Sequence, residues 1–346
     1  MKALQKTTVG FGLELRDVDP PGPLGPHEVL IEVDAAGICG TDVHIYEWTG
    51  GYEHVAPVMP VTLGHEFAGR IAEVGSGVTT LTPGTGVAVR PSVFCGECDA
   101  CRQQRRDLCA SRTSIGILCN GAFAPWVVAP AINCERLPDG VDTQLAALTE
   151  PMTIGARAVE VSEVQEGDRI LVMGPGPIGH FISVMAREAG AKDIVVVGKD
   201  DPDRLASMRS IGFDQTIDLA DGDLESEAKR YMGNDKFDIV FEATGVPVAL
   251  QQGLDVLRRA GVMVTCAIHA VPAAFDVTRF VRAQQQLRGS AVASEATWET
   301  VLGVLAKSGD QLRNIITHRL PLDRAVEGFE MARQKAASKV VILPNA

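Results

Sequence analysis

Several features that mark nucleic-acid-binding, membrane and secreted proteins are missing from this sequence of 346 residues. Basic residues are in deficit, with 32 Lys and Arg against 44 Asp and Glu and a formal net charge of −12. A protein that binds a phosphate backbone needs a basic face instead. No apolar run approaches the roughly 18 residues of a membrane span. The N-terminal MKALQKTTVGFGLELRD lacks the apolar core of a secretory signal. Nucleic-acid and membrane partners are therefore not expected.

Cysteine is too scarce for a disulfide-stapled protein of this length. Only eight cysteines occur, and four of them stand within residues 95–109. Such clustering indicates metal binding in a reducing compartment, so a cytoplasmic location is expected. The hydrophobic share of 46% is that of an ordinary globular protein. The length suits two domains, at roughly 150 residues for each domain.

Two patterns divide the chain. Residues 1–150 hold short Val- and Ile-rich runs between Gly and Pro breakers, which predicts an irregular, mostly antiparallel barrel without a long amphipathic helix. Residues 151–289 alternate apolar strands with helical stretches, one of them over 247–261, as in a parallel sheet with right-handed crossovers. The tail, 290–346, has two helical stretches and a final strand, KVVIL. The predicted fold class is α/β.

A glycine-rich turn separates the first apolar strand after residue 151 from the helix that follows it. Its three glycines suit a tight turn, close approach of a pyrophosphate, and packing of helix on strand. The helix N-terminus adds free N–H groups and a positive dipole end for the phosphates. A purely structural turn can have the same letters, but the flanking strand and helix favour a dinucleotide site. The predicted cofactor-binding residues here are Gly174, Gly176, Pro177, Ile178 and Gly179.

The end of the next strand bears on the choice of dinucleotide. In NAD sites an acidic residue there binds the ribose 2′-hydroxyl, but this strand, IVVV, runs into Gly198 and Lys199. Glycine leaves room and lysine can pair with a 2′-phosphate, which favours NADP or mixed use. In the alternative, Asp200 takes the NAD role slightly later in the chain, and both interpretations stay open. Thr244, near the end of the segment FDIVFEATG, is a further candidate cofactor residue.

Four closely spaced cysteines form a metal-binding pattern. They are Cys95, Cys98, Cys101 and Cys109, with the spacing C-x2-C-x2-C-x7-C. Thiolates two residues apart chelate one ion from a tight turn, and a fourth completes the tetrahedron of a structural zinc site. An iron–sulfur cluster is the rival interpretation. The ferredoxin run has three residues before its last cysteine and a proline after it, whereas Ala110 follows here, so the spacing favours zinc.

Other metal-ligand types stand at three separate places. Cys39 lies in GICGTDVH, His65 and Glu66 lie in GHEFAG, and Glu150 lies in TEP. Thiolate, imidazole and carboxylate all bind zinc, and a catalytic zinc keeps one position open for water or substrate. Taken singly, each residue also fits a plain structural role. The combination with the glycine turn and the cysteine cluster is what indicates a second metal centre.

In these pieces the sequence resembles the zinc-dependent medium-chain alcohol dehydrogenases. The matching segments are GICGTDVH, GHEFAGRIAEVGSGV, the four-cysteine cluster, TEP and GPGPIG, in the family's order and over nearly the whole chain. CGTDVHIYEW resembles the L-threonine dehydrogenase branch, and TEPMTIGA resembles the polyol (sorbitol-like) branch. The resemblance implies a GroES-like catalytic domain at 1–150 plus 290–346, with a structural zinc lobe at about 93–111. It implies a doubly wound Rossmann domain at 151–289.

The resemblance also implies the metal ligands. Cys39 and His65 match catalytic zinc ligands, and Glu66 matches the ligand position typical of the polyol branch. Glu150 matches a position that holds zinc directly or through water. Together with the four cysteines, this implies two zinc ions per chain, one catalytic and one structural.

Further roles are carried over from the family. Thr41 matches the hydroxyl that takes the substrate proton, and His44 matches a next step of that relay. A segment after the last Rossmann strand runs near the nicotinamide in the family, so Ser290 and Val292 are candidate cofactor contacts. Family members are dimers or tetramers, which implies a homodimer or homotetramer here.

The predicted function is hydride transfer from a secondary alcohol to NAD or NADP, which yields a ketone. The expected substrate is a polyol or a related small hydroxy compound. L-threonine 3-dehydrogenase activity is the alternative within the same class. A non-catalytic dinucleotide-binding relative is a remote alternative. The residues that argue against it are Cys39, His65, Glu66 and Thr41, all of which are intact.

Overall fold

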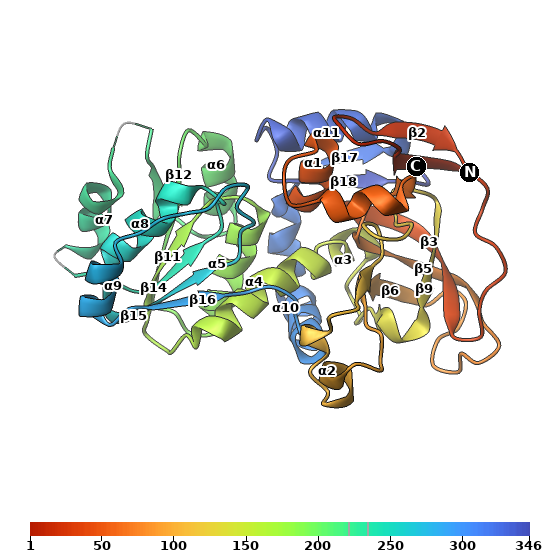
Figure 1. The fold of residues 1–346 in the computed structure, drawn as a ribbon, viewed down its shortest axis with the longest axis horizontal. Coiled ribbons are helices and arrows are strands. Elements are labelled where there is room, and N and C mark those ends of the chain that lie inside the picture. Colours follow the sequence, from red (N-terminus) through yellow and green to blue (C-terminus); the bar gives the residue numbers. More distant parts are fainter. Residues whose placement is uncertain (221, 234) are drawn as a thin grey trace. The chain divides into compact units, whose positions relative to one another are not determined.

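The computed structural model describes residues 1–220, 222–233 and 235–346. It divides into two compact units. Unit 1 comprises Met1–Glu150 and Ser294–Ala346, and unit 2 comprises Pro151–Ala293. In the sequence, unit 2 thus stands between the two segments that make up unit 1. The colours of Figure 1 follow the order of these segments along the chain. In the described part of the chain, no helix has the length and apolar character that crossing a membrane requires.

Unit 1 is built around a seven-stranded sheet with the path β10-β6-β5-β3-β18-β17, and β9 also pairs with β3. The strands are β3 (Glu28–Gly37), β5 (Glu66–Val74), β6 (Gly86–Val89), β9 (Trp126–Pro130), β10 (Cys134–Arg136), β17 (Ile316–Pro321) and β18 (Lys339–Leu343). All of these pairs are antiparallel except β17 with β18. Apolar residues alternate along β3, so Val29, Ile31 and Val33 face the core. The sheet joins the final strand of the chain to β3.

Smaller elements complete unit 1. A three-stranded sheet comprises β1 (Lys2–Lys6), β2 (Glu14–Asp17) and β4 (Val61–Thr62). A two-stranded sheet comprises β7 (Ser92–Val93) and β8 (Thr113–Ser114). The α-helices are α1 (Gly40–Glu47), α2 (Asp99–Arg102), α3 (Thr143–Ala146), α10 (Glu295–Leu312) and α11 (Ala325–Arg333). Five 3-10 turns are η1 (Glu53–Val58), η2 (Arg106–Leu108), η3 (Ala131–Asn133), η4 (Arg313–Ile315) and η5 (Leu322–Arg324). Up to residue 148 the helices are short, because the barrel strands follow one another closely.

Unit 2 is a parallel sheet with the strand order β13-β12-β11-β14-β15-β16 (Figure 1). The strands are β11 (Arg169–Met173), β12 (Asp193–Gly198), β13 (Thr216–Asp218), β14 (Phe237–Glu242), β15 (Leu257–Thr265) and β16 (Gln286–Gly289). The helices are α4 (Thr149–Ser162), whose first two residues belong to unit 1, and α5 (Pro177–Glu188), α6 (Pro202–Ser210), α7 (Leu224–Met232), α8 (Pro247–Val256) and α9 (Val277–Ala283). The order reverses between β11 and β14, which is where doubly wound sheets bind ligands.

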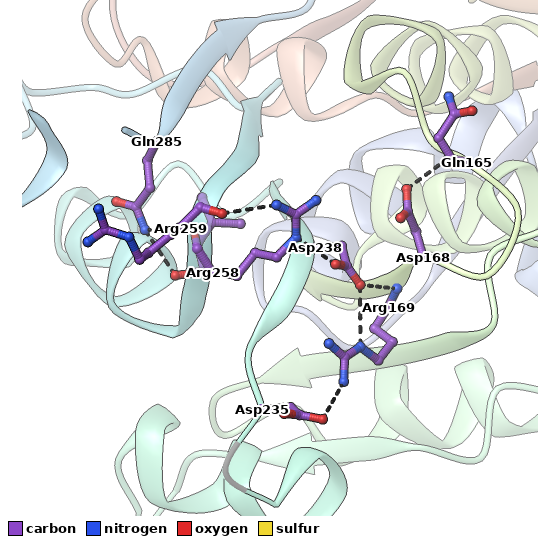
Figure 2. A network of polar contacts seen from close by, with 9 residues as sticks. Gln165, Asp168, Arg169, Asp235, Asp238, Arg258, Arg259 and Gln285 are labelled. Atoms are coloured by element: carbon purple, nitrogen blue, oxygen red, sulfur yellow. Dashed lines mark hydrogen bonds and ion pairs between the residues drawn. The ribbon is translucent and has the colours of Figure 1, made fainter. Parts of the chain in front are cut away.

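The helix that the sequence predicts over 247–261 is shorter in the structure, so that prediction was wrong at its end. α8 stops at Val256, and LRRAG begins β15. Arg258 Nε donates to Asp238 Oδ1 at 2.6 Å, a carboxylate that Arg169 also contacts (Figure 2). The helix ends here because the residues that follow pair with β14 as strand β15, and because Arg258 binds the Asp238 carboxylate. Those partners are distant in the sequence, so no local pattern reveals them.

Candidate zinc and dinucleotide sites

Pairing of β3 with β5 gathers the first candidate metal group. Cys39 follows β3 as the N-cap of α1, and Glu66 begins β5. Gly37 lies opposite Glu66 in the register of the two strands. The ligand atoms of Cys39, His65 and Glu66 all lie within 4.8 Å of one another. Three residues that are separated in the sequence thus form one group.

Two glycines make this approach sterically feasible. A Cβ on Gly37 would lie 2.4 Å from Glu66 Oε2 and 2.8 Å from Lys339 Cε. Gly64 has a φ of +97°, and a Cβ there would lie 2.8 Å from the Phe123 backbone nitrogen. Glycine is therefore required at Gly64, where the φ is positive and a Cβ would meet backbone, whereas a side chain at Gly37 would displace the paired side chains of Glu66 and Lys339.

Asp42 connects two members of the group. Its Oδ2 accepts a hydrogen bond from the Cys39 backbone N–H at 3.0 Å, and its Oδ1 lies 3.4 Å from His65 Nδ1. Asp42 is fully buried. Because Nδ1 faces this carboxylate, Nε2 is the His65 nitrogen left for a metal ion, as in carboxylate–histidine–metal arrangements. Sequence analysis did not single out Asp42, although it stands inside GICGTDVH.

The buried charges of the group act on one another. Burial raises the pKa of Cys39, and the Glu66 charge raises it further. Burial lowers the pKa of His65, but Asp42 and Cys39 raise it more, so the net pKa lies well above its usual value. Lys339 forms an ion pair with Glu66 Oε2 and donates to the Ile38 carbonyl at 2.9 Å.

The group fits a zinc ion. Glu66 Oε1 is buried and has no hydrogen-bond partner in the structure, so one carboxylate oxygen remains for a cation. Thiolate, imidazole and carboxylate are also the donor types that zinc takes in proteins. Glu150, in the first turn of α4, lies outside this set of mutually close atoms. Burial raises the pKa of its carboxyl to about 7, and the charges of His65 and Glu66 also act on it.

Thr41 and His44 both lie on α1, but the structure gives them different partners. Thr41 Oγ1 accepts a hydrogen bond from the Tyr52 hydroxyl at 3.3 Å. His44 Nδ1 lies 2.8 Å from Thr49 Oγ1, and its ring stacks on that of Tyr52. Tyr52 was missed by sequence reasoning, because it lies outside every recognised motif and reaches Thr41 only through the fold.

The four-cysteine cluster closes into a compact group. Cys109 Sγ lies 3.5 Å from Cys95 Sγ, and Cys101 Sγ lies 3.9 Å from Cys95 Sγ. These separations exclude disulfides and match the roughly 3.8 Å between sulfurs around a tetrahedral zinc with Zn–S of about 2.3 Å. A backbone hydrogen bond with Cys101 helps to lower the pKa of Cys98 to about 6, whereas burial raises the pKa of Cys101 to about 12. The cluster therefore fits a zinc ion.

The glycine turn follows β11 in unit 2. Gly174 has a φ of +109°, and a Cβ on Gly179 would lie 1.9 Å from the Gly174 carbonyl oxygen. A Cβ on Gly176, in contrast, would meet nothing within 4 Å. Gly176 is the N-cap of α5, and Pro177 is its first residue. The turn thus combines a tight bend, a close helix–strand contact and open space before a helix N-terminus, which suits a pyrophosphate.

The end of β12 leaves little room for a side chain. A Cβ on Gly198 would lie 3.0 Å from Pro175 Cγ. Lys199 and Asp200 are both exposed, and the Asp200 backbone N–H donates to Asp218 Oδ1 at 2.8 Å. No carboxylate occupies the strand-end position itself, and charges of both signs follow it.

The remaining candidate cofactor residues lie at the carboxyl ends of β14 and β16. The Thr244 hydroxyl donates to Glu242 Oε1 at 2.6 Å and accepts from the Val246 backbone N–H at 3.0 Å. Ser290 donates its backbone N–H to the Thr265 carbonyl at 3.0 Å, and its hydroxyl oxygen is buried without a partner in the structure. Val292 is half-buried in the segment that follows.

Comparison with protein-family models identifies both halves of the chain. Residues 25–139 match the alcohol dehydrogenase GroES-like domain, and residues 177–307 match the zinc-binding dehydrogenase model. These matches agree with the predicted fold class.

Full-length relatives extend this result. A sorbitol dehydrogenase from Halalkalibacterium halodurans is 32% identical, and the alignment covers 99% of each chain. An L-threonine 3-dehydrogenase from Anaeromyxobacter sp. is 35% identical over 99% of this chain and 98% of its own. A crystal structure from Sinorhizobium meliloti, assigned as a zinc-binding dehydrogenase and bound to NADP, has a TM-score of 0.88 at 26% identity and covers 99% of both chains. The protein is therefore an oxidoreductase and a member of the zinc-binding, medium-chain alcohol dehydrogenase family.

Proposed function

We propose that this protein oxidises a secondary alcohol, in a polyol or a related small hydroxy compound, to the ketone with NAD or NADP as hydride acceptor. The observation that carries the proposal is the Cys39–His65–Glu66 group, whose ligand atoms lie within 4.8 Å of one another. A protein that only binds dinucleotides has no use for such a group, whereas metal-assisted oxidation of an alcohol does.

In this proposal Cys39, His65 and Glu66 hold a catalytic zinc ion, and Glu150 completes its shell directly or through water. Zinc at this position supplies Lewis acidity, which lowers the pKa of an alcohol hydroxyl. The Asp42 carboxylate lies 3.4 Å from His65 Nδ1 and orients the ring so that Nε2 is left for the ion. The four-cysteine cluster holds a second, structural zinc, which makes two ions per chain.

The chain's own residues handle the proton and the cofactor. Thr41 takes the hydroxyl proton of the substrate, and His44 continues the relay toward water. The Gly174–Gly179 turn receives the pyrophosphate at the N-terminus of α5, where backbone N–H groups favour an anion. Bound NAD(P)⁺ would supply the redox chemistry, because its nicotinamide would accept the hydride of the carbinol carbon.

L-threonine 3-dehydrogenase activity is the second candidate function. The 35% identity to such an enzyme favours it, since that value lies close to the 32% identity to a sorbitol dehydrogenase. The two substrates differ in charge, because threonine carries a carboxylate and an ammonium group whereas a polyol carries neither.

A substrate panel tests both candidates. Sorbitol, xylitol, L-threonine and simple secondary alcohols are assayed with NAD and NADP side by side, and the zinc content of the protein is measured.

A cysteine substitution tests the metal group. Cys39→Ser is expected to lose one zinc ion and at least 100-fold in kcat. Cys119→Ser changes an exposed cysteine outside both metal-ligand groups and should retain two zinc ions and the wild-type kcat. Full turnover and full zinc content in Cys39→Ser would contradict the proposal. One zinc ion in the wild type with no turnover would favour the non-catalytic alternative.

We further propose that the chain forms a homodimer or homotetramer in the cytoplasm. β16 is an edge strand of its sheet and carries the exposed Leu287 (37%), and α9, which precedes it in the sequence, exposes Val277 (60%) and Val281 (63%). An unpaired edge with apolar neighbours favours contact with a second copy. Light scattering coupled to size exclusion measures the assembly.

A further inference from the structure

The hydroxyl of Thr41 has a partner that no motif contains. The Tyr52 phenol donates a hydrogen bond to Thr41 Oγ1 at 3.3 Å. Thr41 is in the first turn of α1, whereas Tyr52 lies beyond the end of that helix and directly precedes η1. Only 7% of Tyr52 is exposed. The contact therefore joins a buried phenol to a half-buried hydroxyl.

Stacking on two imidazoles holds the Tyr52 ring. The centroid of the His44 ring lies 5.7 Å from that of Tyr52 with planes 16° apart, and the His54 ring lies 6.1 Å away at 30°. The Tyr52 carbonyl also accepts a hydrogen bond from the Val55 backbone N–H at 3.0 Å. A ring fixed in this way places its hydroxyl at one position. His44 thus contacts the ring of Tyr52, while its Nδ1 faces Thr49.

The Tyr52 phenol stays a donor in this environment. Burial raises its pKa more than the hydrogen bond with Thr41 lowers it, and the Cys39 charge raises it further. The phenol also lies near the candidate metal group, because its partner Thr41 stands two residues after Cys39. Tyr52 is therefore protonated at neutral pH and donates to Thr41 throughout.

A hydroxyl oxygen has two lone pairs and one proton to offer. Because Tyr52 occupies one lone pair of Thr41 Oγ1, a single lone pair and the proton remain. A hydroxyl that accepts a hydrogen bond is also polarised, and its own O–H becomes a better donor. Thr41 is thus held in a state in which it can take one proton and release another.

We propose that Tyr52 is a positioning residue for proton transfer, which fixes the Thr41 hydroxyl so that its free lone pair is presented to the substrate. This inference rests on the proposed function. In the step, the substrate O–H proton moves to Thr41 Oγ1 as the proton of Thr41 leaves toward water, and the carbinol hydride goes to NAD(P)⁺. Tyr52 neither gains nor loses a proton.

Tyr52→Phe tests the proposal, because it keeps the ring and its stacking and removes only the hydroxyl. We expect kcat to fall three- to tenfold, the magnitude of one neutral hydrogen bond. KM, the NAD(P)H dissociation constant, zinc content and Tm should change little, and the solvent deuterium isotope effect on kcat should rise. Tyr46→Phe is the matched control, since that buried phenol donates to Glu330 at 2.7 Å instead. It should retain kcat.

A double-mutant cycle separates positioning from a general structural effect. In a Thr41→Ala background, Tyr52→Phe is expected to have no further effect on kcat, because the hydroxyl that it positions is gone. An equal loss in both backgrounds would overturn the inference. Wild-type kcat in Tyr52→Phe, with Thr41→Ala strongly impaired, would overturn it while leaving the proposed function intact. An inactive wild type across the substrate panel would overturn both.

Discussion

Lys339 Nζ and Glu66 Oε2 form an ion pair in which each side chain is 1% exposed. Lys339 begins the final strand, β18, and Glu66 begins β5, so the pair joins residues 273 positions apart. Lys339 also donates to the Ile38 carbonyl at 2.9 Å. The end of the chain thus neutralises a carboxylate of the candidate metal group.

Removal of this lysine should strongly destabilise the metal-free protein. Lys339→Met leaves the Glu66 carboxylate buried without its cation, which costs about 3–5 kcal/mol in comparable buried pairs. Urea unfolding of metal-free protein measures the loss. Lys192→Met, at an exposed position of unit 2, should change stability by less than about 0.5 kcal/mol. A loss below about 1 kcal/mol in Lys339→Met would show that the pair contributes little.

Two alanine substitutions in the glycine turn should have opposite consequences. Gly176→Ala points a methyl group into open space, and its φ of −71° suits alanine. We expect unchanged Tm but at least tenfold weaker NAD(P)H binding by fluorescence titration, because the methyl group fills the space proposed for the pyrophosphate. Gly179→Ala places a Cβ 1.9 Å from the Gly174 oxygen, and overpacking should lower stability by about 1–3 kcal/mol or more. Normal cofactor affinity in Gly176→Ala would contradict the assignment of the turn.

The cysteine cluster should account for one of the two proposed zinc ions. Cys109→Ser replaces a thiolate with a poor ligand, so we expect elemental analysis to find one zinc ion per chain and a lower Tm. Cys134→Ser, at a cysteine outside both metal-ligand groups, should retain two zinc ions. If Cys109→Ser retained both ions, the cluster would not be a zinc site.

His180 should make the protein less stable at acid pH. Its Nδ1 lies 2.9 Å from the Gly176 carbonyl and its Nε2 lies 3.0 Å from Ser207 Oγ. Burial lowers its pKa from 6.5 to about 4. The unfolded chain therefore binds the proton more tightly, and stability is lost as the pH falls below about 6.5 toward 4.

Between pH 7.5 and pH 5, this linkage should remove about 2 kcal/mol of unfolding free energy. Urea titrations of wild type and His180→Gln at the two pH values measure it, since glutamine keeps hydrogen-bonding capacity but does not titrate. The pH-dependent loss should be smaller in His180→Gln by about that amount. Equal losses in the two proteins would assign the pH dependence to other groups.

Local patterns predicted those features whose chemistry lies within a short segment. The glycines of GPGPIG and the four cysteines of the cluster each lie within fewer than twenty residues, so their spacing alone indicated a dinucleotide turn and a metal site. The parallel sheet of unit 2 also followed from strand–helix alternation, and the family comparisons confirm that fold class. The end of α8 was missed because Arg258 turns toward Asp238, a partner twenty residues away on another strand.

For the candidate metal site, sequence alone determined which residue types were present and in what order. The ring orientation of His65, the ion pair of Glu66 with Lys339 and the contact of Thr41 with Tyr52 were decided only by the tertiary structure. The physical reason is that backbone preferences and ligand spacing act over a few residues. Burial and the pairing of β3 with β5 and β18, in contrast, bring together groups that no local spacing relates.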